Sequence, residues 1–543
     1  MNCCHEERQC ADLARLEKQI NEHTNEVYRE LLKRDKKIAD LACKFNGDIQ
    51  KAIYEYLLLM EKEGKLNEII NDTLLNDLLV LEHKTNGVIN IKEFGAIGDG
   101  FCDDTKAIQK AIDHAHEIGG ATVVIPASSG SFIFTAITVK EGVTLKGMGG
   151  VLKVKNSRCT DPEGTYYLIR NEGDNVSIVD LIIDGNKEHN TAYKVADAIT
   201  VMGKNIRVTG CTIMNPPDSG IMYSCVENSL CTGNIIIGAP DCGIYINNND
   251  KTDLMMGSRC DGNIIEGCYT GIAMKRIVHH MSVCGNVIKN CDYGITHENA
   301  SSDTDYSTDT IVNDNIIEGT TYTAIILRGS NNCTVNGNYI NGFKFAGIQL
   351  QGCKECAVVG NTIKGAIVTT DRKGAAISLV ARGNLSCKYN VITANVLEVN
   401  FFDEVYYFSF IEVTGSTNVT SDHNIVTGNT CNGKVTRGMS ITTANNNQIA
   451  NNIFNGATDS ILISGTKGNV LQNNVSDGSP QRIYDVPVIA VTPNGTKIYC
   501  NNLTTAPTFT ANDHDICIAK TPYSSHCTGW TYYGGKWHPL NQL

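Results

Sequence analysis

Acidic residues recur at one fixed point of a repeated sequence pattern, two residues before a glycine. Asp218, Asp241 and Asp292 hold this position, and Tyr269 holds it once. Hydrolysis of a glycosidic bond needs two carboxylates, about 5 Å or about 6.5–9.5 Å apart. Stacked carboxylates also raise the pKa of one member, which makes that group a general acid. Two of the three aspartates follow a proline, which is typical of turns, so a structural role stays open.

A second set of polar residues follows the same glycines. The first and third residues after each glycine are mostly apolar, so the second and fourth should face the opposite side of a strand. In repeat order, the fourth position holds Asn247, Lys275, Glu298, Arg328 and Gln351, and the second position includes Tyr245 and Gln349. We expect a groove for an elongated anionic sugar chain, with Lys275 and Arg328 holding its charge and Glu298 as a further acid. A solubilising ladder of ion pairs is the alternative.

The spacing of asparagines indicates how these residues are positioned. An asparagine recurs at intervals of 22 or 23 residues, lengthened in places by about 6 or 11, at positions 234, 263, 286, 315, 338, 361, 395, 429, 452 and 474. Periods of this length are typical of solenoids. Short β segments between Gly and Asn turns, without regularly spaced leucines, predict a right-handed parallel β-helix with coils about 4.8 Å apart. The asparagines should stack inside it, each satisfying its neighbour's backbone.

The two ends of the chain differ from the repeats. Residues 1–86 are rich in charge and poor in glycine, and Leu13, Leu16, Ile20 and Val27 follow the three-four spacing of a coiled coil. These apolar residues form a stripe along one side of a helix, which predicts a helical segment that self-associates. A helical bundle within one chain would also bury the stripe. We expect the β-helix over residues 87–505 and a short β module over 506–543. That module holds both tryptophans around a Gly-Gly turn, which predicts a hairpin that is structural or, alternatively, binds glycans.

The composition excludes several classes of protein. The 543 residues carry 58 acidic and 46 basic side chains, a net charge of −12, which disfavours a nucleic-acid binder. No apolar run approaches the ~20 residues of a membrane span, and the first residues do not resemble a signal peptide. The 22 cysteines lack zinc-site spacing and are expected to be reduced and buried. No cofactor or metal is predicted. Four aspartates in two insertions could supply a calcium site but do not match an EF-hand loop, namely Asp250, Asp253, Asp303 and Asp305.

One motif resembles a known family. The string FGAxGDGxxDDTxAIQxAID, from Phe94 to Asp113, is similar to the N-terminal cap of the pectate-lyase-like β-helix superfamily. That group includes pectin-degrading enzymes and the tailspike and appendage proteins of bacteriophages. The cap is specific for the fold and says little about activity.

The predicted helical segment at the N-terminus makes the chain more similar to the phage tailspike and appendage proteins of this superfamily than to its pectin-degrading enzymes. It implies a homotrimeric tailspike or appendage protein that is made in the host cytoplasm and carried on the virion tail. Its partners would be other tail proteins, through the N-terminal helices, and a host surface glycan. We expect binding, and degradation by a hydrolase that draws on Glu298, Asp292, Asp241 and Asp218. The alternatives are a polysaccharide lyase with Lys275 or Arg328 as base, an adhesin without catalysis, and a structural virion protein.

Overall fold

A computed structural model describes the chain from residue 87 to residue 541. Within that span, the described residues exclude 160–163, 191–194, 249–256, 277, 299–306, 367–373, 401–406, 417, 465, 467, 477–487, 492–496, 502–515, 520–526 and 534. The predicted coiled coil over 1–86 lies outside the described residues, as do the four aspartates of the insertions. No helix in the described part is long and apolar enough to cross a membrane.

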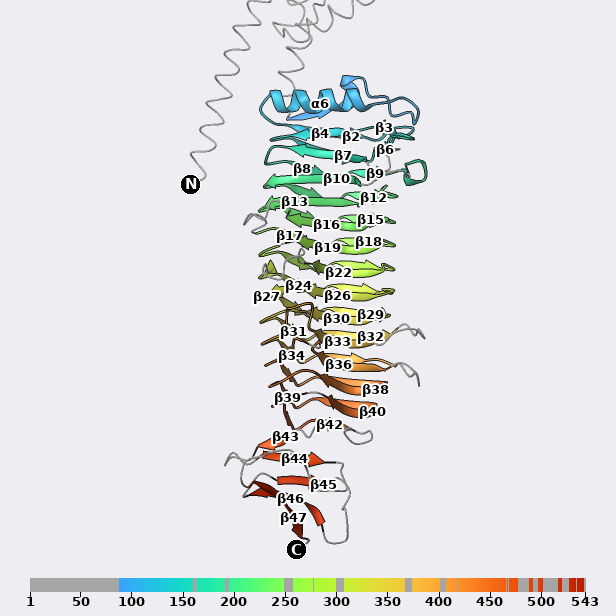
Figure 1. The fold of residues 1–543 in the computed structure, drawn as a ribbon. Coiled ribbons are helices and arrows are strands. Elements are labelled where there is room, and N and C mark those ends of the chain that lie inside the picture. Colours follow the sequence, from blue (N-terminus) through green and yellow to red (C-terminus); the bar gives the residue numbers. More distant parts are fainter. Residues whose placement is uncertain are drawn as a thin grey trace, which may run out of the picture. The chain divides into compact units, whose positions relative to one another are not determined.

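The cap begins with β1 (Val88–Asn90), the 3-10 helix η1 (Ile91–Phe94) and α6 (Thr105–Glu117). The helix buries Ile108, Ala111, Ile112 and Ala115 against the first strands. The Asp103 carboxylate accepts a hydrogen bond from the Thr105 amide at the start of the helix. The helix therefore covers the open end of the strand stack, as Figure 1 shows.

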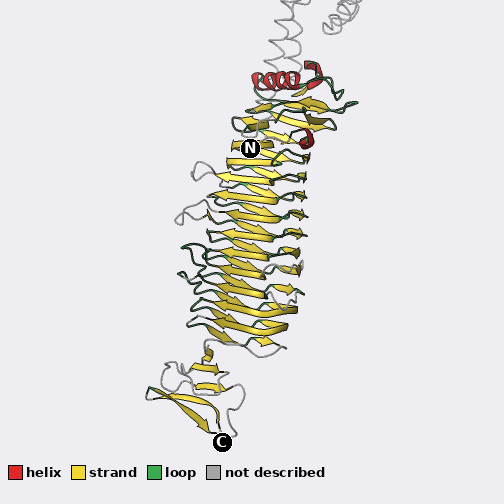
Figure 2. Ribbon diagram, turned by 45° about the vertical axis from the view of Figure 1, so that its right-hand side comes forward, coloured by secondary structure: helices red, strands yellow, loops and turns green. Residues whose placement is uncertain are grey.

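The rest of the described chain to Ser476 is a parallel β-helix, which confirms the predicted fold. Each coil contributes one strand to each of three faces, and strands in successive coils pair in parallel (Figures 1 and 2). We call the face with the longest strands the first face, and the others the second and third faces in chain order.

The first face comprises β4 (Ile137–Lys140), β7 (Thr165–Glu172), β10 (Val195–Lys204), β13 (Ile221–Glu227), β16 (Cys242–Asn248), β19 (Thr270–Arg276), β22 (Tyr293–Glu298), β26 (Thr323–Arg328), β30 (Ala346–Gln351), β33 (Gly374–Val380), β36 (Phe408–Thr414) and the later parts of β38 (Thr430–Thr442) and β40 (Ile453–Ser464). The second comprises β1, β2 (Thr122–Pro126), β5 (Thr144–Met148), β8 (Ser177–Val179), β11 (Arg207–Thr209), β14 (Leu230–Thr232), β17 (Arg259–Asp261), β20 (Ser282–Cys284), β24 (Ile311–Asn313), β28 (Thr334–Asn336), β31 (Ala357–Val359), β34 (Val391–Thr393), β37 (Ile425–Thr427), β39 (Gln448–Ala450) and β41 (Val470–Gln472). The third comprises β3 (Phe132–Phe134), β6 (Val151–Val154), β9 (Ile182–Asp184), β12 (Thr212–Met214), β15 (Ile235–Ile237), β18 (Ile264–Glu266), β21 (Val287–Lys289), β25 (Ile316–Glu318), β29 (Tyr339–Phe343), β32 (Thr362–Ala366), β35 (Val396–Glu398), the earlier parts of β38 and β40, and β42 (Val475–Ser476). The short elements η2 (Lys187–His189), β23 (Ser307–Thr308) and β27 (Ser330–Asn331) lie between faces.

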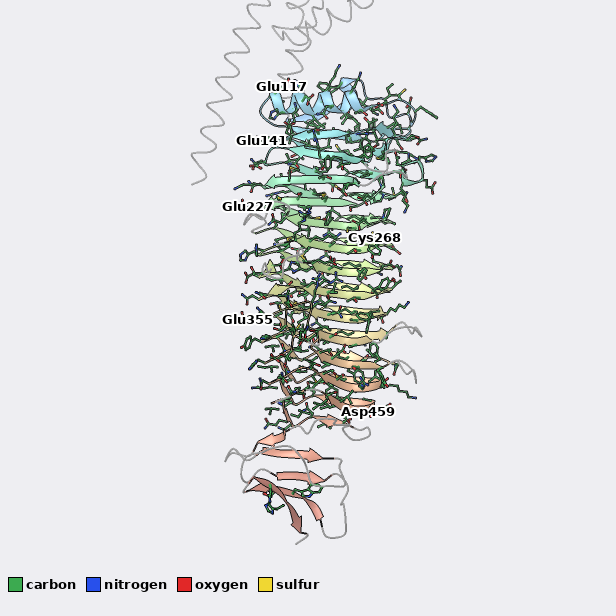
Figure 3. All side chains as sticks on the ribbon, in the orientation of Figure 1. Glu117, Glu141, Glu227, Cys268, Glu355 and Asp459 are labelled. Atoms are coloured by element: carbon green, nitrogen blue, oxygen red, sulfur yellow. The ribbon has the colours of Figure 1, made fainter. Side chains whose placement is uncertain are left out.

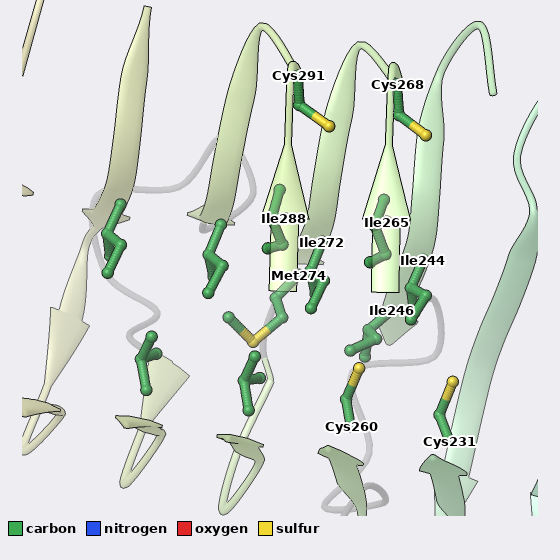
Figure 4. Packing of buried hydrophobic residues seen from close by; sticks show 14 of the residues in the cluster. Cys231, Ile244, Ile246, Cys260, Ile265, Cys268, Ile272, Met274, Ile288 and Cys291 are labelled. Carbon is green, nitrogen blue, oxygen red and sulfur yellow. The ribbon is translucent and has the colours of Figure 1, made fainter. Parts of the chain in front are cut away.

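The interior is a column of stacked aliphatic and cysteine side chains. Figure 4 shows Ile244 beside Ile272 and Ile265 beside Ile288, with Cys268 and Cys291 continuing one such column. A glycine stands near the start of several first-face strands, where the backbones approach closely: a Cβ on Gly243 would lie 2.7 Å from the Gly271 carbonyl oxygen. The recurring Gly-Ile pair is therefore a packing signal. The cysteines whose side chains the structure describes, between Cys102 and Cys431, have free thiols.

The predicted asparagine ladder runs along the corner between the second and third faces. In each step the Nδ2 of one asparagine donates to the Oδ1 of the next, from Asn234 to Asn263 at 3.0 Å and onward to Asn474. The same Oδ1 also accepts a hydrogen bond from the backbone amide of the preceding asparagine in the ladder. For example, the Asn234 amide donates to Asn263 Oδ1 at 3.0 Å. A second ladder, which the sequence reading missed, stacks Asn390, Asn424, Asn447 and Asn469 before the second-face strands.

Beyond Ser476 the described strands change their pairing. They are β43 (Val488–Val491), β44 (Lys497–Asn501), β45 (Ile516–Ala519), β46 (Cys527–Tyr533) and β47 (Lys536–Asn541). β46 and β47 pair antiparallel with Tyr533 opposite Lys536, so the chain does form a hairpin there. Trp530 is buried, which favours the structural role for this tryptophan over sugar stacking. The predicted boundary near residue 505 stays a prediction.

Candidate functional site

The register of the first face brings the predicted polar row together. Asn247 pairs with Lys275, Lys275 with Glu298, Glu298 with Arg328, and Arg328 with Gln351. Residues distant in sequence therefore become neighbours about 4.8 Å apart. Figure 3 shows the described side chains on these coils.

The lower part of this row, toward the C-terminal coils, forms one closed network. Arg328 Nη1 makes an ion pair with Glu298 Oε1, and Arg328 Nε donates to Gln351 Oε1 at 3.1 Å. Gln351 Nε2 donates in turn to Gln349 Oε1 at 2.7 Å, and Gln349 is buried. Because Glu298 is tied to a cation, this network suits binding better than proton donation.

Lys275 is directed away from Glu298 and toward the beginning of the strands. Its ammonium lies over the ring of Tyr245, 4.9 Å from the ring centroid, in a cation–π contact. Burial lowers the pKa of Lys275, but the Cys242 thiol and the carboxylates of Asp241 and Asp218 outweigh it and raise the pKa above its usual value. Lys275 is therefore held protonated beside two carboxylates.

Asp218 and Asp241 occupy the same position in neighbouring coils, as predicted from the glycine spacing, since Ile221 pairs with Ile244. Burial, followed by the negative charge of Asp241, raises the pKa of Asp218 to about 6. The Ala196 amide donates to Asp218 Oδ2 at 3.4 Å and opposes that shift. The pair thus contains one carboxyl suited to hold a proton near neutral pH.

A third carboxyl in the same region escaped the sequence reading. Asp197 on β10 is 1% exposed, and burial together with the charge of Asp218 raises its pKa to about 7. The Thr200 hydroxyl donates to Asp197 Oδ2 at 3.3 Å. Its coil has Ala198 at the glycine position, and Asp197 stands one residue before that position, whereas the predicted aspartates stand two residues before it. The spacing that selected Asp218 and Asp241 therefore did not select Asp197. The available signal was a lone acid between alanines in an otherwise apolar strand.

Two further predicted residues, Asp292 and Asn247, have different surroundings. Asp292 lies two coils below Asp241, and the Thr321 hydroxyl donates to its Oδ1 at 2.5 Å. Asn247 is 3% exposed, and its Oδ1 has no hydrogen-bond partner among the described residues. The structure therefore groups Asp218, Asp241 and Lys275 with Tyr245, and places Glu298, Arg328, Gln349 and Gln351 in a separate network.

Two family models match the chain. A pectate-lyase-like model described as rhamnogalacturonase A/epimerase matches residues 88–296, and a model described as periplasmic copper-binding protein (NosD) matches residues 257–411. The side chains present do not fit a copper site, because no group of three or more His, Cys, Asp or Glu in the described ranges could hold a metal ion. The second match coincides with coils in the middle of the β-helix.

Curated relatives include enzymes that act on polysaccharides and a phage protein. A mannuronan C5-epimerase of Azotobacter vinelandii is 40% identical over 119 residues, which is 20% of this chain and 6% of that protein. An alginate lyase of the same organism is 38% identical over 130 residues, 21% of this chain and 15% of that protein. A pre-neck appendage protein of Bacillus phage B103 is 22% identical over 306 residues, 51% of this chain and 33% of that protein. The matches thus span only a minor part of each relative.

Solved structures support the fold. The A-module of a mannuronan C-5 epimerase from Azotobacter vinelandii superposes with a TM-score of 0.54 and 18% identity, covering 72% of this chain and all of that one. The tailspike of E. coli bacteriophage HK620, in complex with a pentasaccharide, gives a TM-score of 0.50 and 13% identity, covering 73% and 80%. The expected resemblance is confirmed: a pectate-lyase-like family model matches residues 88–296, the described coils form a parallel β-helix, and a phage appendage protein and a phage tailspike are among the relatives and structural neighbours that this chain resembles.

Proposed function

We propose that this chain is a phage tailspike or appendage protein that binds a host surface polysaccharide and cleaves it by hydrolysis. The observation that carries the proposal is the stacked pair of Asp218 and Asp241 beside Lys275, with the pKa of Asp218 raised to about 6. Relatives named for mannuronan, alginate and phage appendages, and a tailspike neighbour that holds a pentasaccharide, support this class of substrate and this location.

The two carboxyl groups take different roles. Protonated Asp218 donates its proton to the glycosidic oxygen as the bond from that oxygen to the anomeric carbon breaks. Strand spacing of about 4.8 Å is close to the ~5–5.5 Å of retaining enzymes, so ionised Asp241 attacks the anomeric carbon and forms a glycosyl ester. Water then cleaves the ester after Asp218, now ionised, takes its proton. Lys275 neutralises part of the charge that accumulates on the pair.

The same electrostatics argue against the lyase alternative. A lyase base must be unprotonated to remove the proton next to a uronate carboxyl, but the neighbouring carboxylates raise the pKa of Lys275. Arg328 is bound to Glu298 and remains a cation despite a lowered pKa. Adhesion without cleavage is the second candidate, favoured by the closed Glu298–Arg328–Gln351 network.

The test is cleavage of a polymer panel that contains mannuronan, rhamnogalacturonan and envelope polysaccharides from bacterial hosts. New reducing ends without ultraviolet-absorbing products indicate hydrolysis, and absorbing products indicate a lyase. We expect Asp218→Asn and Asp241→Asn to lower cleavage by about 10²–10⁴-fold. Glu318→Gln on the third face is the matched control and should cleave normally. Binding without any cleavage would support the adhesin, and neither binding nor cleavage would reject the proposal.

We also propose a homotrimer that residues 1–86 assemble and attach to the tail. Three copies joined through a heptad-like stripe would bury its apolar residues. Light scattering should give three times the 59.0 kDa chain mass, and a monomer would contradict the trimer.

A further inference from the structure

Three tyrosines lie along the edge of the first face in the coils that follow Asp241. Tyr269 takes, one coil further on, the position that Asp241 holds, because Cys242 pairs with Thr270. The next two coils supply Tyr293, whose amide donates to the Tyr269 carbonyl at 2.9 Å, and Tyr322, whose amide donates to the Asp292 carbonyl at 2.9 Å. We call these three residues the tyrosine strip.

The rings of the strip contact one another. The centroids of Tyr269 and Tyr293 are 5.6 Å apart in an edge-on arrangement, and those of Tyr293 and Tyr322 are 5.1 Å apart with an interplanar angle of 11°. Tyr269 is 48% exposed, and the other two are half-buried. Exposed aromatic surface that adjoins a polar site is typical of ligand contact.

The strip joins the two polar regions of the first face. At one end it begins directly after Asp241. At the other end, Tyr322 directly precedes β26, the strand that ends in Arg328. Burial and Arg382 lower the pKa of Arg328, and the phenols of Tyr293 and Tyr269 oppose that shift. A polymer laid along the coils from Asp218 toward Gln351 would therefore cross the tyrosines.

We propose that Tyr269, Tyr293 and Tyr322 bind sugar rings of the polymer on the side of the cleavage point that faces the C-terminal coils. This inference rests on the proposed function. Coils repeat every ~4.8 Å, close to the length that one sugar adds to a linear chain, so the strip accommodates about three sugars. A sugar ring has an apolar C–H face and a rim of hydroxyls, which match the face and the phenol group of tyrosine.

Several exposed apolar residues elsewhere on the described coils have a different character. On the third face Ile264 is 45% exposed and Ile316 is 41% exposed, and both are aliphatic. They offer no flat ring to a sugar. The second face does have one comparable aromatic pair, in which Tyr389 stacks on His423 with centroids 5.3 Å apart. That pair has no carboxylate column beside it and provides a matched control.

The experiment measures how binding depends on oligosaccharide length. The probes are size-fractionated oligosaccharides, from disaccharides to octasaccharides, of the panel polymer that wild type binds. Calorimetry is done in an Asp241→Asn background to prevent cleavage. We expect Tyr269→Ala to weaken binding of the octasaccharide about tenfold and to leave the disaccharide unchanged. Tyr269→Phe should retain most of the affinity because the ring face makes the larger contact and only the phenol hydroxyl is lost, and Tyr389→Ala should bind as the parent does.

Several outcomes would overturn the inference. Tyr269→Ala and Tyr322→Ala variants that fold and bind the octasaccharide as tightly as the parent would reject the strip. An equal loss for short and long probes would also reject it, since that pattern reports a disturbed carboxylate site. Should Tyr269→Ala fail to fold, Tyr269→Gln gives the same readout. If wild type binds no polymer in the panel, the proposed function fails; if it binds and the tyrosine variants bind equally, only the strip fails.

Discussion

The asparagine ladder and the aspartate column both repeat one polar residue per coil, yet they behave in opposite ways. Each ladder amide carries donors and an acceptor, so every copy satisfies the next, as from Asn315 to Asn338 at 2.9 Å. Carboxylates have only acceptors when ionised, so stacked copies repel and one must hold a proton. Burial first, and then the charge of a neighbouring carboxylate, raise the pKa of Asp218 to about 6 and the pKa of Asp197 to about 7.

This difference separates structure from function within one fold. A self-satisfying ladder stabilises the coils and needs no ligand. A column of half-buried like charges costs stability, and after two coils Tyr269 interrupts it before Asp292 resumes it. Carboxyl groups with perturbed pKa values are typical of active sites.

The largest expected effect is on catalysis and concerns the proton of Asp218. Cleavage by a protonated Asp218 should fall as pH rises through about 6, since the acid is then ionised. The loss should reach about tenfold per pH unit above that value, or about 100-fold near pH 8. Rates of reducing-end release across pH 4–9 check this. A flat profile between pH 5 and pH 8 would remove Asp218 as general acid.

Next in size is the effect of removing the charge of Asp197. A carboxyl whose pKa rises from 3.8 to about 7 on folding binds more protons in the folded state, so wild type loses stability as pH rises from about 4 to about 7. The full loss is on the order of 4 kcal/mol. Asp197→Asn should unfold like wild type near pH 4 and be more stable at pH 8. Denaturant titrations at both pH values measure this, and equal stability at pH 8 would contradict the burial of an ionisable acid.

The ladder should respond in the opposite direction and without pH dependence. Asn338→Ala removes the acceptor for the Asn315 amide and the donor to the Val312 carbonyl, both buried. We expect a loss of roughly 3 kcal/mol at any pH. Asn341→Ala, on the exposed side of β29, is the control and should change stability by less than about 0.5 kcal/mol. A similar cost at both sites would mean that the ladder is not the stabilising feature.

The smallest effect is expected where repeated charges alternate in sign. On the third face Lys289 Nζ lies 3.2 Å from Glu318 Oε2, and both side chains are more than a third exposed. Water and salt screen this pair, so Glu318→Gln should lower stability by no more than about 1 kcal/mol. Thermal unfolding of Glu318→Gln and of wild type at low and high salt tests this prediction. A larger loss of stability that does not depend on salt would contradict it, because the pair would then contribute as the buried asparagine ladder does.

Sequence periodicity predicted the coils, the strand register and the rows of residues on each face. The intervals between asparagines and between Gly-Ile pairs number the coils, and a coil offset by one residue would turn apolar side chains outward. This is why Asn247, Lys275, Glu298, Arg328 and Gln351 were correctly expected in one row. The predicted catalytic and binding roles of these residues remain predictions.

The sequence by itself determined which residues align in successive coils, because the period of a solenoid decides which residues become neighbours on one face. Only the tertiary structure decided which neighbours interact, since long side chains lean along the face: Lys275 toward Tyr245 and the aspartates, and Arg328 toward Glu298 and Gln351. Burial was likewise decided in three dimensions. Burial, and then the charge of Asp218, raise the pKa of Asp197, and the spacing of residues in the sequence does not predict this burial.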